Sequence, residues 1–198
     1  MALTHSTPLP FVGAESNASL VKPATQELEL EFAEQFKRLL GKFIFCVNEQ
    51  ECAAQLLALS SQLGWESIYC TEQNLTTRLA PHGFSRFVQT GLAACDVAIT
   101  SCELLVARTG SIVMSSAQQS GRTASVYAPV HVCIAYSSQL VYDIRDGLLL
   151  LRKKYQGQWP SLVTFATGPS RTADIEKTLV VGVHGPKEVY LFLVDEQS

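Results

Sequence analysis

A segment near the C-terminal end of the chain, residues 167–176, combines residue types that bind small anions. Its glycine allows close backbone approach, its serine and threonine can cap a helix, and its arginine offers a planar fork of donors to a carboxylate or phosphate. It is predicted to follow a strand and to open a helix, where backbone amides attract anions. The predicted ligand-binding residues here are Gly168, Ser170, Arg171, Thr172 and Asp174. The alternative is a well-capped turn with an exposed arginine, since acidic residues in the first turn would partly oppose an anion.

His184 is the best candidate for a general acid or base, because an unperturbed histidine has a pKa of about 6.5 and this one precedes the tight turn Gly185–Pro186. The competing interpretation is a hydrogen-bonded structural histidine. His5, His82 and His131 have weaker claims, and His131 lies inside an apolar run where a core role is expected.

Two further loops flank a short apolar run in the middle of the chain. Thr109 and Gly110 precede it, Arg122 follows it, and Glu103 lies in the turn before. We assign ligand binding to the first three residues and a catalytic role to Glu103, with a solvated helix residue as the alternative for Glu103. Because adjacent parallel strands bring distant loops together, we expect Thr109, Arg122, Arg171 and His184 to share one cleft.

Composition excludes several classes of protein. The chain has 15 Lys plus Arg against 18 Asp plus Glu, a net charge of −3, which argues against a general nucleic-acid-binding surface. It has no apolar run long enough to span a membrane and no secretory signal, so a cytoplasmic location is expected. Six cysteines and four histidines show no metal-ligand spacing, and dinucleotide and phosphate-loop fingerprints are missing. We therefore predict no metal and no cofactor, with the cysteines as buried reduced thiols.

The elements that position these residues alternate along the chain. Residues 1–23 are predicted to be a flexible arm, and residues 24–198 a single domain. Strands are predicted at 43–47, 67–70, 97–100, 111–114, 130–136, 162–166 and 189–194. Helices are predicted at 25–40, from the Asn48 cap to Gly64, at 75–79, at 102–107, from Leu140 to the basic end at Lys154, and at 173–179. This alternation favours an α/β fold, a Rossmann-like, mainly parallel sheet flanked by helices.

The segments 167–176 and 181–186 closely resemble the signature of the lactate-utilisation protein C family, whose members carry a LUD domain. The resemblance extends more loosely to 96–100, 109–111 and 121–122. It implies a fold similar to the ribose-phosphate isomerase and CoA-transferase group. It also implies a cytoplasmic role in oxidising L-lactate to pyruvate beside iron–sulfur protein partners, with this chain as the cluster-free member. The family usually has an acidic residue where Arg108 precedes Thr-Gly, which puts a catalytic role at that position in doubt.

Three functions remain open on the sequence. The first is a component of lactate oxidation that binds a small carboxylate or phosphate-bearing ligand, in which Arg171 or Arg122 holds the ligand and His184 moves a proton. The second is a non-catalytic assembly or regulatory subunit of the same system. The third is an isomerase or acyl-transfer enzyme, which rests on fold analogy alone.

Overall fold

A five-stranded parallel sheet forms the centre of the computed structural model, which describes residues 26–173, 179–181 and 185–196. Its strands, in spatial order, are β1 (Lys42–Cys46), β11 (Glu188–Val194), β6 (Val130–Tyr136), β3 (Val97–Thr100) and β2 (Ile68–Tyr69). Every neighbouring pair is parallel. Continuous apolar runs are typical of strands buried on both faces, and this sheet confirms the predicted α/β fold.

Helices α2 (Glu49–Leu63) and α3 (Gln73–Leu79) cover one face of this sheet. As predicted, α2 begins at Asn48, whose side chain accepts a hydrogen bond from the backbone N–H of Glu51 at 2.9 Å. It ends at Gly64, which is in the left-handed conformation. Alternate residues of β6, such as Val132 and Ile134, pack in the same core as the buried side of α2.

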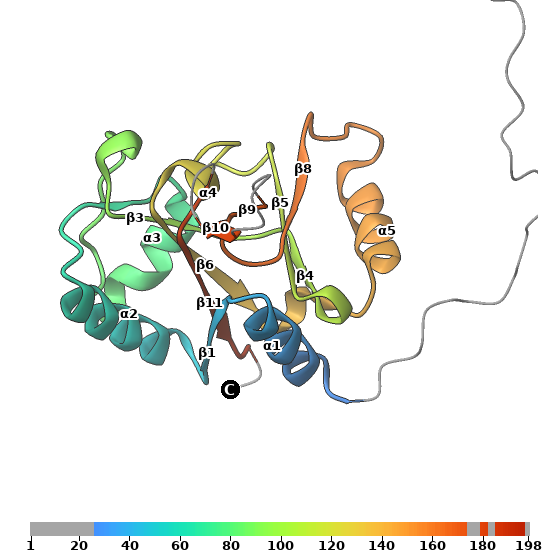
Figure 1. Ribbon diagram of the computed structural model, residues 1–198, viewed down its shortest axis with the longest axis horizontal. Helices are drawn as coiled ribbons and strands as arrows, with labels where there is room; N and C mark the ends of the chain where they lie inside the picture. Colours follow the sequence, from blue (N-terminus) through green and yellow to red (C-terminus); the bar gives the residue numbers. More distant parts are fainter. Residues whose placement is uncertain (1–25, 174–178, 182–184, 197–198) are drawn as a thin grey trace, which may run out of the picture.

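The opposite face is covered by α1 (Leu28–Arg38) and by a second sheet, which the sequence did not predict. The second sheet has the order β7 (Leu140–Val141), β4 (Leu104–Val106), β5 (Ser111–Ser115) and β8 (Val163–Ala166). β5 is antiparallel to both of its neighbours. Helix α5 (Ile144–Tyr155) packs on the outer side of this sheet through Leu151, so the molecule is layered from α2 to α5 (Figure 1).

Two predicted helical segments differ from the structure, and residues 174–178 of a third, at 173–179, lie outside the described residues. Residues 102–107 contain strand β4, because a short apolar run fits either period and the pairing with β5 decides the outcome. Leu140 belongs to β7, and α5 begins only after its cap Asp143. Of the predicted helix at 173–179, only the two end residues are described, and both are in strands: β9 (Arg171–Ala173) pairs antiparallel with β10 (Leu179–Val181). A further short helix, α4 (Ala124–Tyr127), lies between β5 and β6 along the chain.

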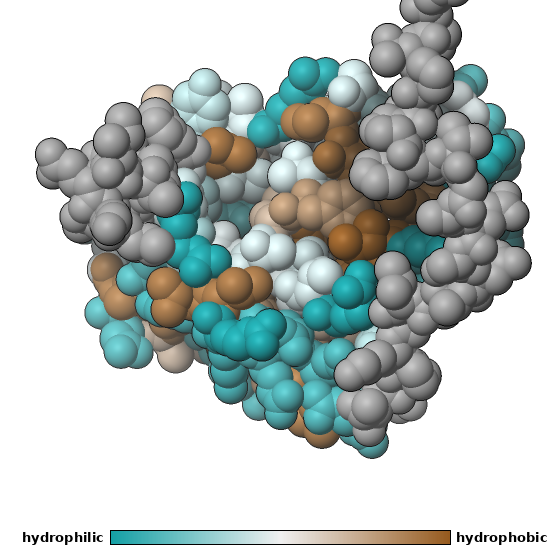
Figure 2. All heavy atoms as spheres, turned by 45° about the vertical axis from the view of Figure 1, so that its right-hand side comes forward, coloured by the Kyte–Doolittle hydropathy of each residue, from teal (hydrophilic) through white to brown (hydrophobic). Residues whose placement is uncertain are grey.

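The surface carries hydrophobic side chains among hydrophilic ones. Figure 2 turns the α5 side of the molecule forward and shows both kinds of residue exposed there. Leu148, Leu149 and Trp159 are among the exposed large hydrophobic residues. Within the described residues, no helix has the length and apolar character needed to cross a membrane. The predicted arm at 1–23 lies outside the described residues.

Candidate functional site

The two signature turns lie against each other. The backbone N–H of Ser170 donates a hydrogen bond to the carbonyl of Pro186 at 2.9 Å. A Cβ atom on Gly185 would lie 2.9 Å from the Cβ of Ser170, so the two turns are in contact. Arg171, the next residue, is exposed at the start of β9, which also contains Thr172. His184 and Asp174 lie outside the described residues, but the chain on the C-terminal side of His184 is held beside Ser170 and Arg171.

The position of this turn differs from the sequence-based expectation. It follows a strand, β8, as predicted, but β8 belongs to the second sheet and the turn leads into strand β9 rather than into a helix. Among the residues that the structure describes, no helix N-terminus follows this turn to supply amides to residues 168–173. Pro186 comes just before β11 begins, so the turn lies at the amino edge of the parallel sheet, opposite the edge that usually binds ligands.

Helix α1 accounts for two of the predicted ligand-binding glycines. Gly110 has a φ of +61°, and a Cβ there would lie 2.6 Å from the backbone nitrogen of Phe36. Gly168 has a φ of +123°, and its Cβ would overlap the carbonyl oxygen of Leu39. Both positions thus need glycine because the α1 backbone passes directly over them. Thr109, beside the first glycine, shares a hydrogen bond of 2.6 Å with the hydroxyl of Ser111.

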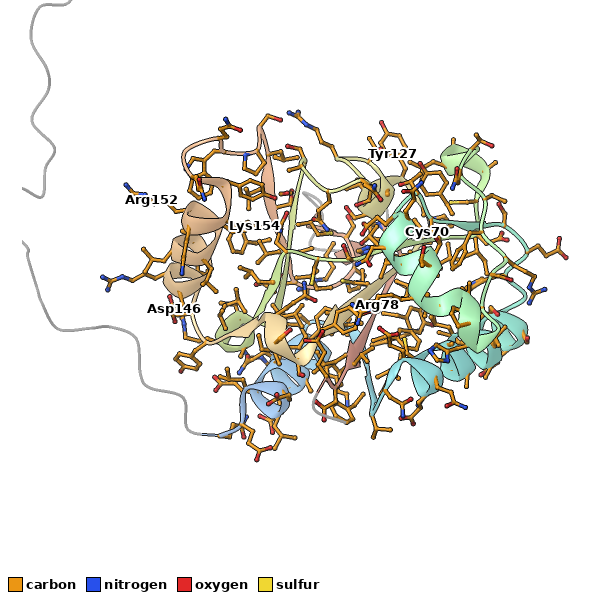
Figure 3. All side chains as sticks on the ribbon, turned by 180° about the vertical axis from the view of Figure 1, so that it is seen from behind. Cys70, Arg78, Tyr127, Asp146, Arg152 and Lys154 are labelled. Atoms are coloured by element: carbon orange, nitrogen blue, oxygen red, sulfur yellow. The ribbon has the colours of Figure 1, made fainter. Side chains whose placement is uncertain are left out.

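Glu103 is buried in a hydrogen-bonded cluster between β5 and α5. Its Oε1 accepts hydrogen bonds from the hydroxyls of Ser115 at 2.5 Å and Tyr155 at 2.6 Å, and its Oε2 accepts one from Lys154 Nζ at 2.6 Å. Only 1% of the Glu103 side chain is exposed, whereas 60% of the Lys154 side chain is exposed. Figure 3 shows Lys154 on the side of α5 that faces the strands and Arg152 pointing away.

The electrostatics of this cluster favour an ionised carboxylate. Burial alone would raise the pKa of Glu103, but the hydrogen bonds from Lys154, Ser115 and Tyr155 together hold it below its ordinary value. A carboxylate that already accepts three hydrogen bonds and has a lowered pKa is a weak proton acceptor at neutral pH. The alternative, a solvated helix residue, is wrong, because the Glu103 side chain is buried and the residue lies just before β4.

Arg122 and Thr109 lie at opposite ends of β5, so they do not share one cleft. The Arg122 guanidinium donates a hydrogen bond to the hydroxyl of Ser161, just before β8. In the antiparallel pair, that end of β8 lies beside Ser115, while its other end lies near Ile112. The expectation of a single crevice is therefore wrong for these two residues.

Arg108, at the position where the resemblance implied an acidic residue, is held in an ion pair. Its Nε lies 2.5 Å from Oδ2 of Asp143, whose other oxygen accepts a hydrogen bond from the backbone N–H of Arg145. This carboxylate therefore caps α5 and fixes the arginine at the same time.

His131 also has a structural environment, since its Nε2 lies 2.9 Å from Thr100 Oγ1 and burial lowers its pKa to about 4.

A pocket at the carboxyl edge of the parallel sheet was not identified from the sequence. It has a volume of about 430 Å³ and is lined by Glu49, Arg78, His82 and Tyr136, with residues that follow β11. The guanidinium carbon of Arg78 lies 4.1 Å from the centre of the Tyr136 ring. Both Arg78 and the Tyr136 hydroxyl donate hydrogen bonds to Glu49 Oε1, the latter at 3.2 Å. Figure 3 shows Arg78 directed from α3 toward the strands.

This pocket has a sequence signal that could have located it. Asn48 caps α2 directly after the apolar strand β1, which is the strand-to-helix junction where parallel sheets bind ligands. Burial raises the pKa of Tyr136, and the neighbouring Glu49 raises it further, although the charge of Arg78 acts in the opposite direction. The hydroxyl therefore stays protonated and acts as a hydrogen-bond donor.

Metal-binding side chains are dispersed through the described part of the structure. All six cysteines are described and buried as free thiols. In the ranges 26–173, 179–181 and 185–196, no group of three or more His, Cys, Asp or Glu is placed to hold a metal ion. The described side chains thus provide neither a metal centre nor a set of cluster ligands.

Comparison with known proteins finds similarity in the part of the chain that follows residue 84. The model of the LUD domain matches residues 85–194. Lactate utilization protein C from Shouchella clausii is 35% identical over 103 residues, which are 52% of this chain and 45% of that protein. The Bacillus subtilis protein of the same name is 34% identical over 104 residues, 52% of this chain and 43% of that protein. The aligned segment spans less than half the length of each of these relatives.

Two comparisons extend over more of the chain. Lactate utilization protein C from Oceanobacillus iheyensis is 25% identical over 182 residues, 90% of this chain and 75% of that protein. The crystal structure of a DUF162 family protein from Deinococcus radiodurans superposes with a TM-score of 0.62 at 17% identity. It covers 84% of this chain and 96% of that chain, so the two proteins share the fold.

Proposed function

This chain belongs to the LUD-domain family, and from that premise we propose that it is a component of cytoplasmic lactate utilisation that binds a small carboxylate at its signature turns. The observation that carries the proposal is the contact between Ser170 and Gly185. It brings the turn before Arg171 against the turn after His184, which are the two parts of the chain with anion-binding and proton-transfer chemistry.

In this proposal Arg171 holds the ligand and His184 moves the proton. The guanidinium of Arg171 is exposed and can bind both oxygens of a lactate or pyruvate carboxylate. A phosphate-bearing ligand would use the same donors. His184 would take the proton from the hydroxyl of the 2-hydroxy acid as the carbon is oxidised.

Breaking the C–H bond of lactate releases two electrons and a second proton, and both must leave this chain: we assign the electrons to the iron–sulfur partners and the proton to solvent. Cluster ligation needs cysteine thiolates, and the thiols of Cys70 and Cys133 are poor sources of thiolate. Burial raises the pKa of Cys70 to about 11. Cys133 lies against Cys102, and burial together with this neighbour raises the pKa of Cys133 well above its ordinary value. These properties support the assignment of the chain as the cluster-free member.

Calorimetric titration of the purified chain with L-lactate, pyruvate and inorganic phosphate tests the proposal. We expect binding of at least one carboxylate, and we expect Arg171→Ala to weaken it by about 1.5–3 kcal/mol with little change in melting temperature. Arg86→Ala is the matched control, because Arg86 is also exposed but lies in the loop before β3. Equal affinity in Arg171→Ala, Arg86→Ala and the wild type would refute the assignment of Arg171.

A non-catalytic assembly subunit is the second candidate, favoured by a specific observation. Gly110 and Gly168 are explained by packing on α1, and Glu103 is saturated by hydrogen bonds, so several predicted site residues have structural roles. This candidate predicts that none of the three ligands binds and that Arg171→Ala lowers stability. The titration and the melting temperature of that one variant therefore distinguish the two functions.

A further inference from the structure

Strand β1 is at the edge of the parallel sheet and leaves one side of its backbone open. Among the described residues, β1 pairs only with β11. Its neighbour along the chain, α1, packs against it, because the centre of the Phe32 ring on α1 lies 6.2 Å from that of Phe43 on β1. We call this unit, residues 27–47, the α1–β1 edge. Natural proteins seldom leave such an edge uncovered, since an open strand recruits another chain.

A groove between α1 and β1 adds an apolar surface to the open strand. It has a volume of about 590 Å³, and its lining includes Leu30, Ala33, Phe43 and Phe45. Leu30 is 56% exposed and Phe45 is 44% exposed, values that are high for large hydrophobic residues. Contiguous apolar surface next to the open edge of a strand is typical of an interface between proteins.

The two ends of the α1–β1 edge carry opposite charges. Glu27, Glu29 and Asp195 line the groove at the end where β1 finishes, as the backbone N–H of Asp195 donates to the carbonyl of Cys46. At the other end, the last turn of α1 contains Lys37 and Arg38. The exposed Leu40 lies beside them, with a φ of +69°.

We propose that two copies of this chain associate along β1 in an antiparallel, two-fold arrangement that continues the sheet from one copy into the other. The rotation places the basic end of each α1–β1 edge against the acidic groove of its partner, and it brings the exposed Leu40 of each copy to the partner's apolar groove. A second copy is the occupant because the unit is complementary to itself, which is what a two-fold interface requires. Main-chain hydrogen bonds between the two β1 strands then satisfy both open edges.

Sedimentation or light scattering of the full chain at micromolar concentration tests this proposal. The wild type is expected to be a dimer whose dissociation constant rises with salt. Glu29→Lys or Lys37→Glu alone should raise that constant about tenfold, because each change places like charges together twice in a two-fold dimer. Glu66→Lys and Lys153→Glu are matched controls, since they make the same charge changes at exposed sites outside the edge.

Mixing the two edge variants gives the sharpest result. A heterodimer of Glu29→Lys with Lys37→Glu pairs opposite charges at both contacts, so the mixture should regain dimer that neither variant forms well alone. Unfolding midpoints close to that of the wild type show that the variants are folded. A monomeric wild type would overturn the proposal and would assign the groove to a different occupant. Single variants that dimerise as tightly as the controls would overturn it too. The outcome is independent of ligand binding at Arg171.

Discussion

Glu103 and Glu49 have similar partners but opposite surroundings. Each accepts a hydrogen bond from a tyrosine hydroxyl and one from a cationic side chain, Lys154 for Glu103 and Arg78 for Glu49. The Glu103 side chain is 1% exposed, whereas that of Glu49 is 26% exposed and lines the pocket at the carboxyl edge of the parallel sheet.

This difference separates a structural carboxylate from an accessible one. Ser115 supplies Glu103 with a third donor, and the cluster ties α5 to the second sheet. Glu49 keeps contact with solvent through the pocket, and His82 approaches its other oxygen at 4.0 Å. Residue type alone would rank the two carboxylates equally, and their burial and the donor from Ser115 distinguish them.

Removing Glu103 should have the largest effect on stability. Glu103→Ala removes the acceptor of both hydroxyls, and since Ser115 and Tyr155 lie 3.1 Å apart only one of them can then donate to the other, so we expect a loss of about 3 kcal/mol in the free energy of unfolding. Urea denaturation measures it. Glu66→Ala is the control, because Glu66 is exposed, and it should cost less than about 0.5 kcal/mol. Equal losses in the two variants would contradict the structural role of Glu103.

The contribution of Glu103 should also depend on pH. Its pKa is lower in the folded chain than its ordinary value of 4.5, so the stabilisation is complete above 4.5 and is lost as the pH falls through the folded pKa. The difference in unfolding free energy between the wild type and Glu103→Ala should therefore be constant near neutrality and shrink in acid. Urea denaturation over a pH series measures this difference. A difference that grows as the pH falls below 4.5 would show that the sign is wrong.

Strands with continuous apolar runs could be predicted from the sequence, and so could α2. The consecutive apolar residues of β1, β3, β6 and β11 mark these strands in the sequence. The capping residue Asn48 marks where α2 starts. In the second sheet, β5 and β8 were predicted as strands, but β4 and β7 were not. β4 has three residues, too few to show a period, and it is a strand because β5 and β7 pair with it.

The candidate sites were predicted only in part, because their residues meet across long separations in sequence. Glu103 was identified by its type and position, but Lys154 was interpreted only as a favourable charge at the end of a helix. The pocket combines Glu49 with Tyr136, which are 87 positions apart, and no local pattern connects them. By contrast, the contact between Ser170 and Gly185 joins two turns that both belong to the signature segments in the sequence.

The smallest expected effects come from removing the tyrosine hydroxyl that donates to each carboxylate, that of Tyr155 for Glu103 and that of Tyr136 for Glu49. Tyr155→Phe deletes a donor that lies 2.6 Å from Glu103, where little water can replace it, so we expect a loss of about 1.5 kcal/mol. Tyr136→Phe deletes a longer bond of 3.2 Å to Glu49, which retains Arg78 and contact with solvent, so the loss should be about 0.5 kcal/mol. Tyr127→Phe is the control, since that residue is 67% exposed. Urea denaturation of the three variants gives the order directly. A larger loss from Tyr136→Phe than from Tyr155→Phe would mean that Glu49, and not Glu103, is the carboxylate on which the fold depends.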